Sequence, residues 1–82
     1  MDYHARYKPQ AIRDLDALSP DVRRRVIRKI EAMQHDLAGD VKRLTNFTPE
    51  YRLRVGDYRV LFDVERDEIV IYRVLHRSES YR

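Results

Sequence analysis

The stretch YRLRVGDYRVLFDV, residues 51–64, alternates apolar and polar side chains on both sides of Gly56-Asp57. Alternation with a period of two predicts two β-strands, and glycine at the first central position of the loop suits a type II′ turn. A loop of these two residues sets Arg54 directly opposite Arg59. The other predicted cross-strand pairs are Val55 with Tyr58, Leu53 with Val60, Arg52 with Leu61 and Tyr51 with Phe62.

The two faces of this predicted hairpin differ in chemistry, because successive side chains of a strand point to opposite faces. One face is apolar enough to be core and carries Tyr51, Leu53, Val55, Tyr58, Val60, Phe62 and Val64. The other face carries Arg52, Arg54 and Arg59. Like charges directly opposite each other destabilise a sheet, so folding gains nothing from this second face. It points instead to a polyanionic ligand.

Length and composition limit the protein to one small domain, which we expect to span residues 1–82. The hydrophobic fraction of 43% can build one core, and the 38% of charged residues are interleaved with apolar ones, which argues against disorder. A net charge of +3 is too small to indicate a nucleic-acid partner by itself. The distribution of the charge must decide that question.

Several classes of site and location are disfavoured by what the sequence lacks. There is no cysteine, and the three histidines form no HxH or HExxH motif, so we expect no metal site. No glycine-rich phosphate loop occurs, and we expect no cofactor. The N-terminus does not resemble a signal peptide and no apolar run reaches the length of a membrane span, so we expect a cytoplasmic protein without membrane contact.

Before the hairpin, the pattern predicts a short strand and a first helix. Residues 2–7 alternate as a strand. Pro9 suits the first turn of a helix in which Asp14 and Asp16 face outward. The apolar side of this helix is predicted to carry Ala11, Ile12, Leu15 and Leu18.

A second helix is predicted to begin at Ser19-Pro20-Asp21, which supplies an N-cap residue, a proline at the first position and an acid in the first turn. Gly39 is expected to end this helix. The apolar stripe of the helix consists of Val22, Val26, Ile27, Ile30, Met33 and Leu37. The helix also carries Arg23, Arg24, Arg25, Arg28 and Lys29. These cations form either a solvated outer face or a second phosphate-contacting surface.

The connector of residues 40–50 either starts a strand at Val41 or packs on the sheet, and Lys42 and Arg43 are expected to extend the positive face of the hairpin. After a polar turn, residues 69–75 form a β-branched and aromatic run that fits a covered central strand. Its register is left open by the uncertain turn length. The order β-α-α-β-β-β predicts an α+β fold, a small mainly antiparallel sheet with a helical hairpin on one face.

The residues that remain for chemistry are the arginine surface and the chain end at His76 and Tyr81. RNA can be cut without a metal when its 2′-hydroxyl attacks the adjacent phosphate, which requires a base, cations that stabilise the transition state, and an acid for the leaving 5′-oxygen. Arginine binds phosphate bidentately but is a poor base. The proton carriers would be His76, Tyr81 or the surroundings of the RNA, while Arg59 has the simpler alternative of pairing with an aspartate.

The segment YRLRVGDYRV at residues 51–60, followed by His76-Arg77 and Tyr81, resembles the RelE branch of the RelE/ParE toxin superfamily. The resemblance covers nearly the whole chain. It implies the mRNA interferase toxin of a type II toxin–antitoxin system, a metal-independent endoribonuclease that cuts mRNA in the ribosomal A site. It also implies a cognate antitoxin that blocks the basic face, and contact with operator DNA only through that antitoxin.

The resemblance also implies roles for single residues. Arg59 stands at a family arginine that contacts the scissile phosphate, and Arg77 at one associated with the leaving group. Tyr81 matches a tyrosine that stacks on RNA and assists proton transfer, and His76 an acid or base of some relatives. Arg52 and Arg54 stand where the best-known members carry lysines, which keeps phosphate binding but disfavours a general base there. The RNA-binding set is thus expected to be Arg52, Arg54, Lys42 and Arg43, with Arg54, Arg59, His76, Arg77 and Tyr81 catalytic.

One further departure and two rival functions complete the expectation. The sequence ends at Arg82, so we expect no C-terminal helix of the kind that some members have. One rival is a toxin of the ParE branch, which inhibits DNA gyrase by binding and does not need the clustered arginines. The other is a silent member that survives as a binding module, against which intact Arg59, Arg77 and Tyr81 argue.

Overall fold

The computed structural model describes residues 1–79, which form five strands and two helices. The elements are β1 (His4–Tyr7), α1 (Pro9–Asp16), α2 (Pro20–Met33), β2 (Val41–Arg43), β3 (Tyr51–Val55), β4 (Tyr58–Glu65) and β5 (Glu68–His76). The strands form one sheet in the order β1-β5-β4-β3-β2, in which β1 runs parallel to β5 and all other neighbours are antiparallel.

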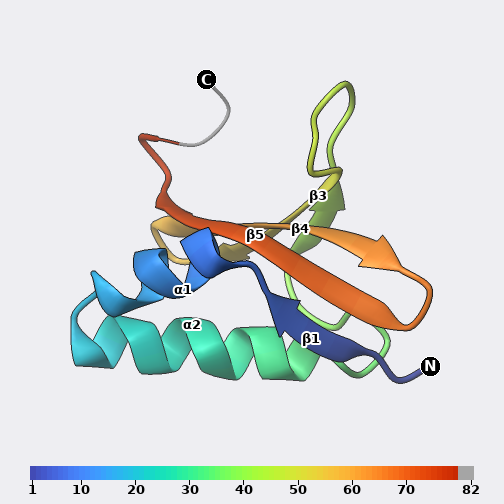
Figure 1. Cartoon of the computed structure of the whole chain (residues 1–82), viewed down its shortest axis with the longest axis horizontal. Coiled ribbons are helices and arrows are strands. Elements are labelled where there is room, and N and C mark those ends of the chain that lie inside the picture. Colours follow the sequence, from blue (N-terminus) through green and yellow to red (C-terminus); the bar gives the residue numbers. More distant parts are fainter. Residues whose placement is uncertain (80–82) are drawn as a thin grey trace.

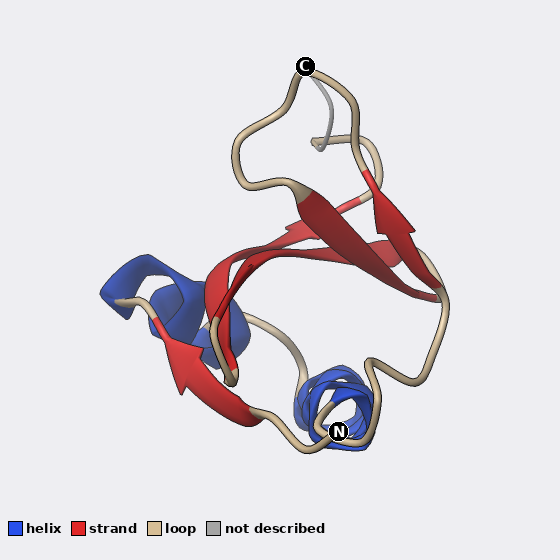
Figure 2. Ribbon diagram, turned by 90° about the vertical axis from the view of Figure 1, so that its right-hand side faces the viewer, coloured by secondary structure: helices blue, strands red, loops and turns tan. Residues whose placement is uncertain are grey.

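Both helices lie on one side of this sheet, as Figure 1 and the turned view of Figure 2 show. The loop between β2 and β3 and residues 77–79, which follow β5, rise on the opposite side (Figure 1). The predicted α+β class is confirmed, and the connector does contribute a strand, β2, at the sheet edge. No helix among residues 1–79 is long and apolar enough to cross a membrane.

The β3–β4 hairpin has the predicted register, with Val55 opposite Tyr58, Arg54 opposite Arg59 and so on to Tyr51 opposite Phe62. Gly56 adopts φ +57°, a conformation that glycine reaches without a steric penalty. The loop of two residues fixes the register, and the register decides which side chains meet the helices.

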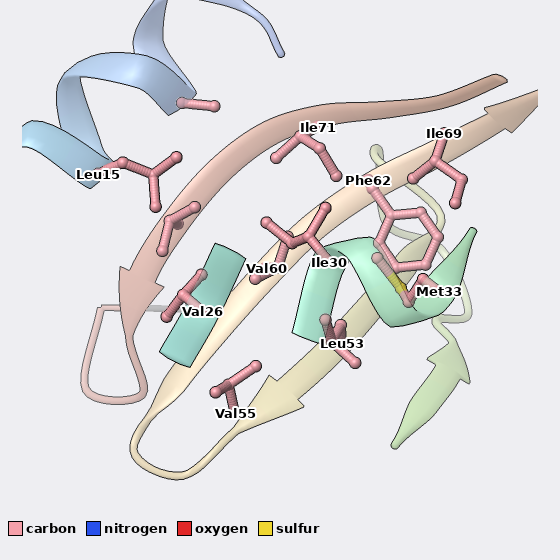
Figure 3. Packing of buried hydrophobic residues seen from close by; sticks show 12 residues of the cluster. Leu15, Val26, Ile30, Met33, Leu53, Val55, Val60, Phe62, Ile69 and Ile71 are labelled. Atoms are coloured by element: carbon pink, nitrogen blue, oxygen red, sulfur yellow. The ribbon is translucent and has the colours of Figure 1, made fainter. Parts of the chain in front are cut away.

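The core lies between the sheet and the helices (Figure 3). From the hairpin, Leu53, Val60 and Phe62 are fully buried, and Val55 is 3% exposed. They pack with three fully buried residues of α2, namely Val26, Ile30 and Met33. The Tyr51 ring stacks on that of Phe62 with 5.4 Å between centroids. The predicted apolar face is therefore the core face.

Strand β5 is an interior strand, as the sequence predicted, and it pairs with β1 on one side and β4 on the other. Glu65 pairs with Glu68 across the turn, but Leu61 pairs with Arg73 while Phe62 pairs with Ile71. This shift is a β-bulge that leaves Tyr72 as the extra residue. The bulge, as well as the turn, settles the register that the sequence left open.

Three expectations about the helices are wrong. Helix α2 ends at Met33 and not at Gly39, because the N-terminal segment takes over the hydrogen bonds there: the Tyr3 nitrogen donates to the Gln34 oxygen (2.8 Å) and the Asp36 nitrogen to the Met1 oxygen (2.9 Å). The predicted start of α2 is confirmed, since Ser19 occupies the N-cap position and Pro20 begins the helix, although the Ser19 side chain makes no capping hydrogen bond.

In α1, Ile12 is 48% exposed, whereas Asp14 faces the sheet. Asp14 follows Ala11 by three positions and therefore lies on the same helical face as the buried Ala11 and Leu15. The apolar spacing alone concealed this polar contact to β5.

Candidate functional site

Four cations gather on the face of the sheet that the helices leave uncovered. Lys42 pairs in register with Arg52, and Arg54 with Arg59, so strand alternation places all four side chains on one face. Together with Leu44 they line an open hollow of about 330 Å³. We call this surface, made of Lys42, Arg52, Arg54 and Arg59, the cationic face. The charge and the open shape of this face suit a polyanionic ligand.

Arg54 and Arg59 keep their charges available. No carboxylate among residues 1–79 forms an ion pair with either of them. The Nη1 of Arg59 donates to the carbonyl oxygens of Gly56 (2.9 Å) and Tyr58 (3.0 Å), which fixes the guanidinium over the hairpin turn. The simpler alternative for Arg59 does not occur, since Asp63 accepts instead from the Glu50 nitrogen at 2.6 Å.

Arg52 is held differently from its neighbours. Its side chain is 15% exposed, and its Nη1 donates to the backbone oxygen of Asp40 (2.9 Å) and lies 3.3 Å from the Asp40 carboxylate. The same backbone oxygen accepts from the Arg54 nitrogen at 3.0 Å. Asp40, which the sequence patterns did not single out, thus fixes the Arg52 side chain at the edge of the cationic face and partly neutralises its charge.

Lys42 and Arg43 were expected on the same surface, and the structure separates them. Arg43 pairs in register with Tyr51, so it lies on the helix side of the sheet, opposite to Lys42. Its Nη2 is 3.0 Å from the Glu50 carboxylate. Only Lys42 extends the cationic face.

The first residue after β5 lies beside the hairpin turn. The backbone nitrogen of Arg77 donates to the Asp57 oxygen at 2.7 Å, and its Nε is 3.9 Å from the Asp57 carboxylate. Arg77 is thereby brought next to the turn on which the Arg59 guanidinium rests. Tyr81, the other chain-end residue singled out from the sequence, lies outside the described residues.

His76 is on the other side of the sheet. It pairs in register with Tyr58, whose ring packs against the core cluster, and the two rings meet edge to face with centroids 5.4 Å apart. Its Nδ1 lies 2.9 Å from the Ser78 hydroxyl and accepts from the Ser78 nitrogen at 3.3 Å. The structure therefore does not bring His76 together with Arg54 and Arg59.

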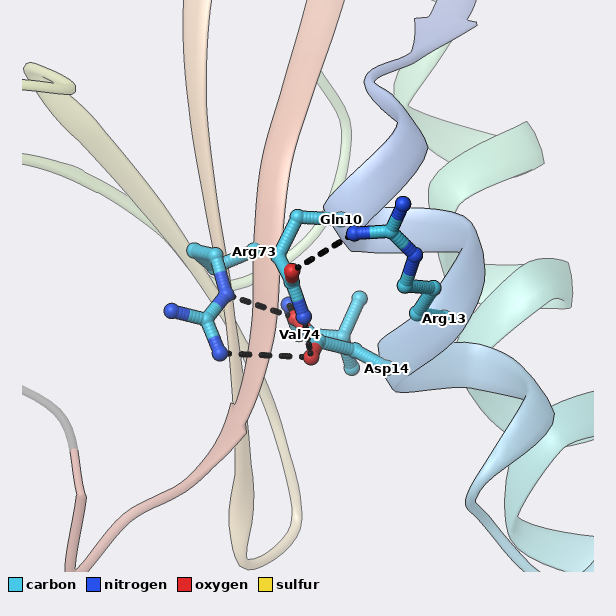
Figure 4. Close-up of polar contacts among 5 residues, drawn as sticks. All are labelled: Gln10, Arg13, Asp14, Arg73 and Val74. Carbon is cyan, nitrogen blue, oxygen red and sulfur yellow. Dashed lines mark hydrogen bonds and ion pairs between the residues drawn. The ribbon is translucent and has the colours of Figure 1, made fainter.

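Asp14 holds the end of β5 that leads to Arg77 (Figure 4). Its carboxylate accepts from Arg73 Nε (2.8 Å) and Nη2 (3.2 Å) and from the Val74 nitrogen (2.9 Å). Strand β1 ends at Tyr7 and pairs no further than Ile71, so Asp14 supplies an acceptor where the neighbouring strand is missing. Burial alone would raise the pKa of Asp14, but the hydrogen bonds from Arg73, Val74 and Gln10 outweigh it and lower the pKa.

The arginines of α2 do not share one role. Arg23 donates to the oxygens of Leu15 (3.0 Å) and Leu18 (3.0 Å), which caps the end of α1, so this arginine is structural. Arg25 reaches the hairpin turn, where its Nη2 lies 3.7 Å from the position that a Cβ on Gly56 would take. Arg25 thus links the basic side of α2 with the edge of the cationic face.

Among residues 1–79, no group of three or more His, Asp or Glu side chains is placed to hold a metal ion. The arrangement offers fixed cations and hydrogen-bond donors. Its chemistry is phosphate binding and the stabilisation of negative charge on phosphate oxygens.

Comparisons with known proteins find similarity along most of the chain. A family model described as "ParE toxin of type II toxin-antitoxin system, parDE" matches residues 5–81. "Toxin RelE3" of Methanocaldococcus jannaschii is 36% identical over 75 residues, with 85% of each chain covered.

Two solved structures are also similar. One is the RelB–RelE antitoxin–toxin complex from Methanococcus jannaschii, with a TM-score of 0.75, 32% identity, and 92% of this chain and 93% of that chain covered. The other is the toxin–antitoxin complex RelBE2 from Mycobacterium tuberculosis, with a TM-score of 0.80, 27% identity, and 94% of this chain and 100% of that chain covered.

Proposed function

The chain belongs to the ParE toxin family of type II toxin–antitoxin systems, on the RelE branch of the RelE/ParE superfamily, and from this premise we propose that it cleaves mRNA in the ribosomal A site. The observation that carries the proposal is the pair of arginines, Arg54 and Arg59, that face each other without a carboxylate partner among residues 1–79. Such an arrangement costs folding free energy and favours a phosphate ligand.

The proposed reaction is an in-line displacement at phosphorus that needs no metal. The 2′-hydroxyl loses its proton and attacks the adjacent phosphate, the P–O5′ bond breaks, and the products are a 2′,3′-cyclic phosphate and a 5′-hydroxyl. Arg59 and Arg54 stabilise the charge on the phosphate oxygens, and Arg77 beside the turn acts at the leaving oxygen. Lys42 and Arg52 bind flanking phosphates.

Proton transfer has fewer candidates than the sequence suggested. His76 lies on the helix side of the sheet, where its Nδ1 is engaged by Ser78. We therefore assign the proton to Tyr81 or to groups that the ribosome places around the RNA. His76 then serves to fix the position of Arg77, the next residue along the chain.

A cognate antitoxin is the proposed protein partner, because the solved relatives are RelB–RelE complexes. An acidic segment of the antitoxin would bind the cationic face and exclude mRNA. Contact with operator DNA would be made by the antitoxin alone. The site of action is the cytoplasm, where the ribosomes are.

The second candidate function is inhibition of DNA gyrase, which the family model's name suggests. A gyrase inhibitor acts by binding and has no need for two arginines fixed over one turn. A supercoiling assay with purified gyrase discriminates between the two. Inhibition without any new mRNA ends would support this second function.

The experiment is expression of the toxin alone and with its antitoxin, with mapping of the 5′ ends of cellular mRNA. We expect new ends within codons for the wild type, and cleavage lower by about 10²- to 10³-fold for Arg59→Ala, since one transition-state donor is lost. Arg6→Ala is the matched control, because this arginine lies on β1 at the other edge of the sheet and pairs with Glu68. If Arg59→Ala cleaves as well as Arg6→Ala does, the site is misassigned. If the wild type produces no new mRNA ends, the protein is a catalytically silent member of the family.

A further inference from the structure

A second hollow adjoins the cationic face at the loop between β2 and β3. This hollow measures about 740 Å³ and is lined by the loop residues 44–48 together with Arg43 and Glu50. Leu44 also lines the hollow of the cationic face, so the two hollows share this residue. The loop rises on the side of the sheet that the helices leave uncovered (Figure 1), which is also the side of the cationic face.

Phe47 is the most unusual residue of this loop. It is 40% exposed, and the only other exposed large apolar residues among residues 1–79 are Met1 and Ile12, neither of which is aromatic. The neighbouring Thr45, Asn46 and Thr48 also line the hollow and carry neutral donors and acceptors. An exposed ring among neutral polar groups beside a cationic groove is the usual composition of a site for single-stranded nucleic acid.

The loop is anchored at its base. The Leu44 nitrogen donates to the Glu50 oxygen at 2.6 Å, Arg43 pairs with the Glu50 carboxylate at 3.0 Å, and the Glu50 nitrogen donates to Asp63 at 2.6 Å. These bonds join the loop to β4 and limit the entropy that a ligand must remove on binding. The volume of the hollow is also in the range of known ligand sites, roughly 300–1,000 Å³.

We propose that loop 44–50 is a nucleobase subsite for the RNA strand whose phosphate lies at Arg54 and Arg59. Phe47 stacks on a base near the cleaved bond, and the side chains of Thr45, Asn46 and Thr48 hydrogen-bond to its edge. Cations alone bind every sequence equally, so this loop supplies a preference for particular nucleotides. The inference rests on the proposed function and adds to it the part of the chain that selects the cutting position.

The first test measures the binding of a short single-stranded RNA that carries 2-aminopurine, whose fluorescence is quenched by stacking. Phe47→Ala should bind about 5- to 100-fold more weakly and lose the quenching, since stacking of one base contributes about 1–3 kcal/mol. Phe47→Tyr, which keeps an aromatic face, should bind as the wild type does. Ile12→Ala is the matched control, as it removes an exposed apolar side chain from α1 and should change nothing.

The second test maps cut positions in mRNA on ribosomes for the same variants. Phe47→Ala should flatten the nucleotide preference beside the cut. Unchanged RNA affinity and unchanged preference in Phe47→Ala would overturn the inference, as would an equal loss in Ile12→Ala. Weaker antitoxin binding with unchanged RNA binding would also overturn it and assign Phe47 to the protein interface.

Failure of the proposed mRNA cleavage can be distinguished from failure of the nucleobase subsite. A wild type that leaves ribosome-bound mRNA intact, yet binds the fluorescent RNA through Phe47, refutes cleavage and keeps the subsite. If Phe47→Ala does not fold, Phe47→Leu replaces it, because leucine keeps the apolar bulk but has no aromatic face. RNA binding by Phe47→Leu as tight as that of the wild type would then overturn the inference.

Discussion

The two faces of the β3–β4 hairpin belong to the same stretch of backbone and follow opposite rules. On the helix side, Leu53, Val60 and Phe62 are fully buried among the residues of α2. On the outer side, Arg54 of β3 pairs with Arg59 of β4, one position along from the pair of Leu53 and Val60. The first face lowers the free energy of the fold by burying apolar area, whereas the second raises it by opposing like charges.

This difference separates the residues that stabilise the fold from those that we propose bind a ligand. A face that stabilises the fold needs no further explanation. A face that destabilises the fold is explained by the proposed ligand, and two arginines favour an anion. Variants at neighbouring positions on the two faces can test the distinction directly.

The largest effect on stability is expected for Phe62→Ala. Truncation of this fully buried ring should lower the free energy of unfolding by about 3–5 kcal/mol, from lost burial and the cavity left behind. Leu61→Ala is the control on the outer face of the same strand and should cost about 1 kcal/mol. Denaturant unfolding measures both, and equal losses would remove the distinction between the faces.

A smaller effect is expected for Asp14→Asn, which breaks the ion pair with Arg73 behind the chain end. At neutral pH we expect a loss of about 1 kcal/mol, since the Arg73 side chain is partly exposed. A carboxylate whose pKa is lowered on folding stabilises the fold above its unfolded pKa, near 3.8, and that stability is lost as the pH falls through the folded pKa.

The pH dependence therefore provides its own check. The stability difference between wild type and Asp14→Asn should shrink when unfolding is measured below about pH 4, where the wild-type carboxylate takes up a proton. A difference that stays constant from neutral to acidic pH would mean that the ion pair in Figure 4 does not stabilise the fold.

The smallest effect has the opposite sign. Arg54→Gln removes one of two like charges and should raise the free energy of unfolding by about 0.2–1 kcal/mol at low salt. The gain should diminish as salt screens the repulsion. Arg43→Gln, which removes a cation already paired with Glu50, should give no gain. A stability loss in Arg54→Gln would show that the cationic face contributes to folding after all.

Sequence patterns predicted the parts of the fold that depend on neighbouring residues in the chain. The alternation around Gly56-Asp57 predicted the hairpin register and both faces, and the apolar run at residues 69–75 predicted an interior strand. The end of α2 could not be predicted, because backbone bonds from the N-terminal segment, and not Gly39, terminate it. Asp14 shares a helical face with Ala11 and Leu15, but its contact with β5 could not be predicted because it depends on the point at which β1 stops pairing with β5.

For the candidate site, too, the sequence predicted some placements of residues and not others. Strand alternation in the sequence is sufficient to place Arg52, Arg54 and Arg59 on one face. It could not place His76 on the opposite face, since this depends on the β-bulge that shifts the pairing of β5 with β4. Nor could it predict the role of Asp40, whose contact with Arg52 joins residues far apart in the chain.

The most direct test of the account is the rate of mRNA cleavage on programmed ribosomes by Arg54→Gln, compared with wild type at equal concentrations of folded protein. The account predicts that this variant cleaves at least about tenfold more slowly although its fold is as stable as the wild type or more so. Cleavage at the wild-type rate would contradict the claim that the cationic face is maintained for RNA.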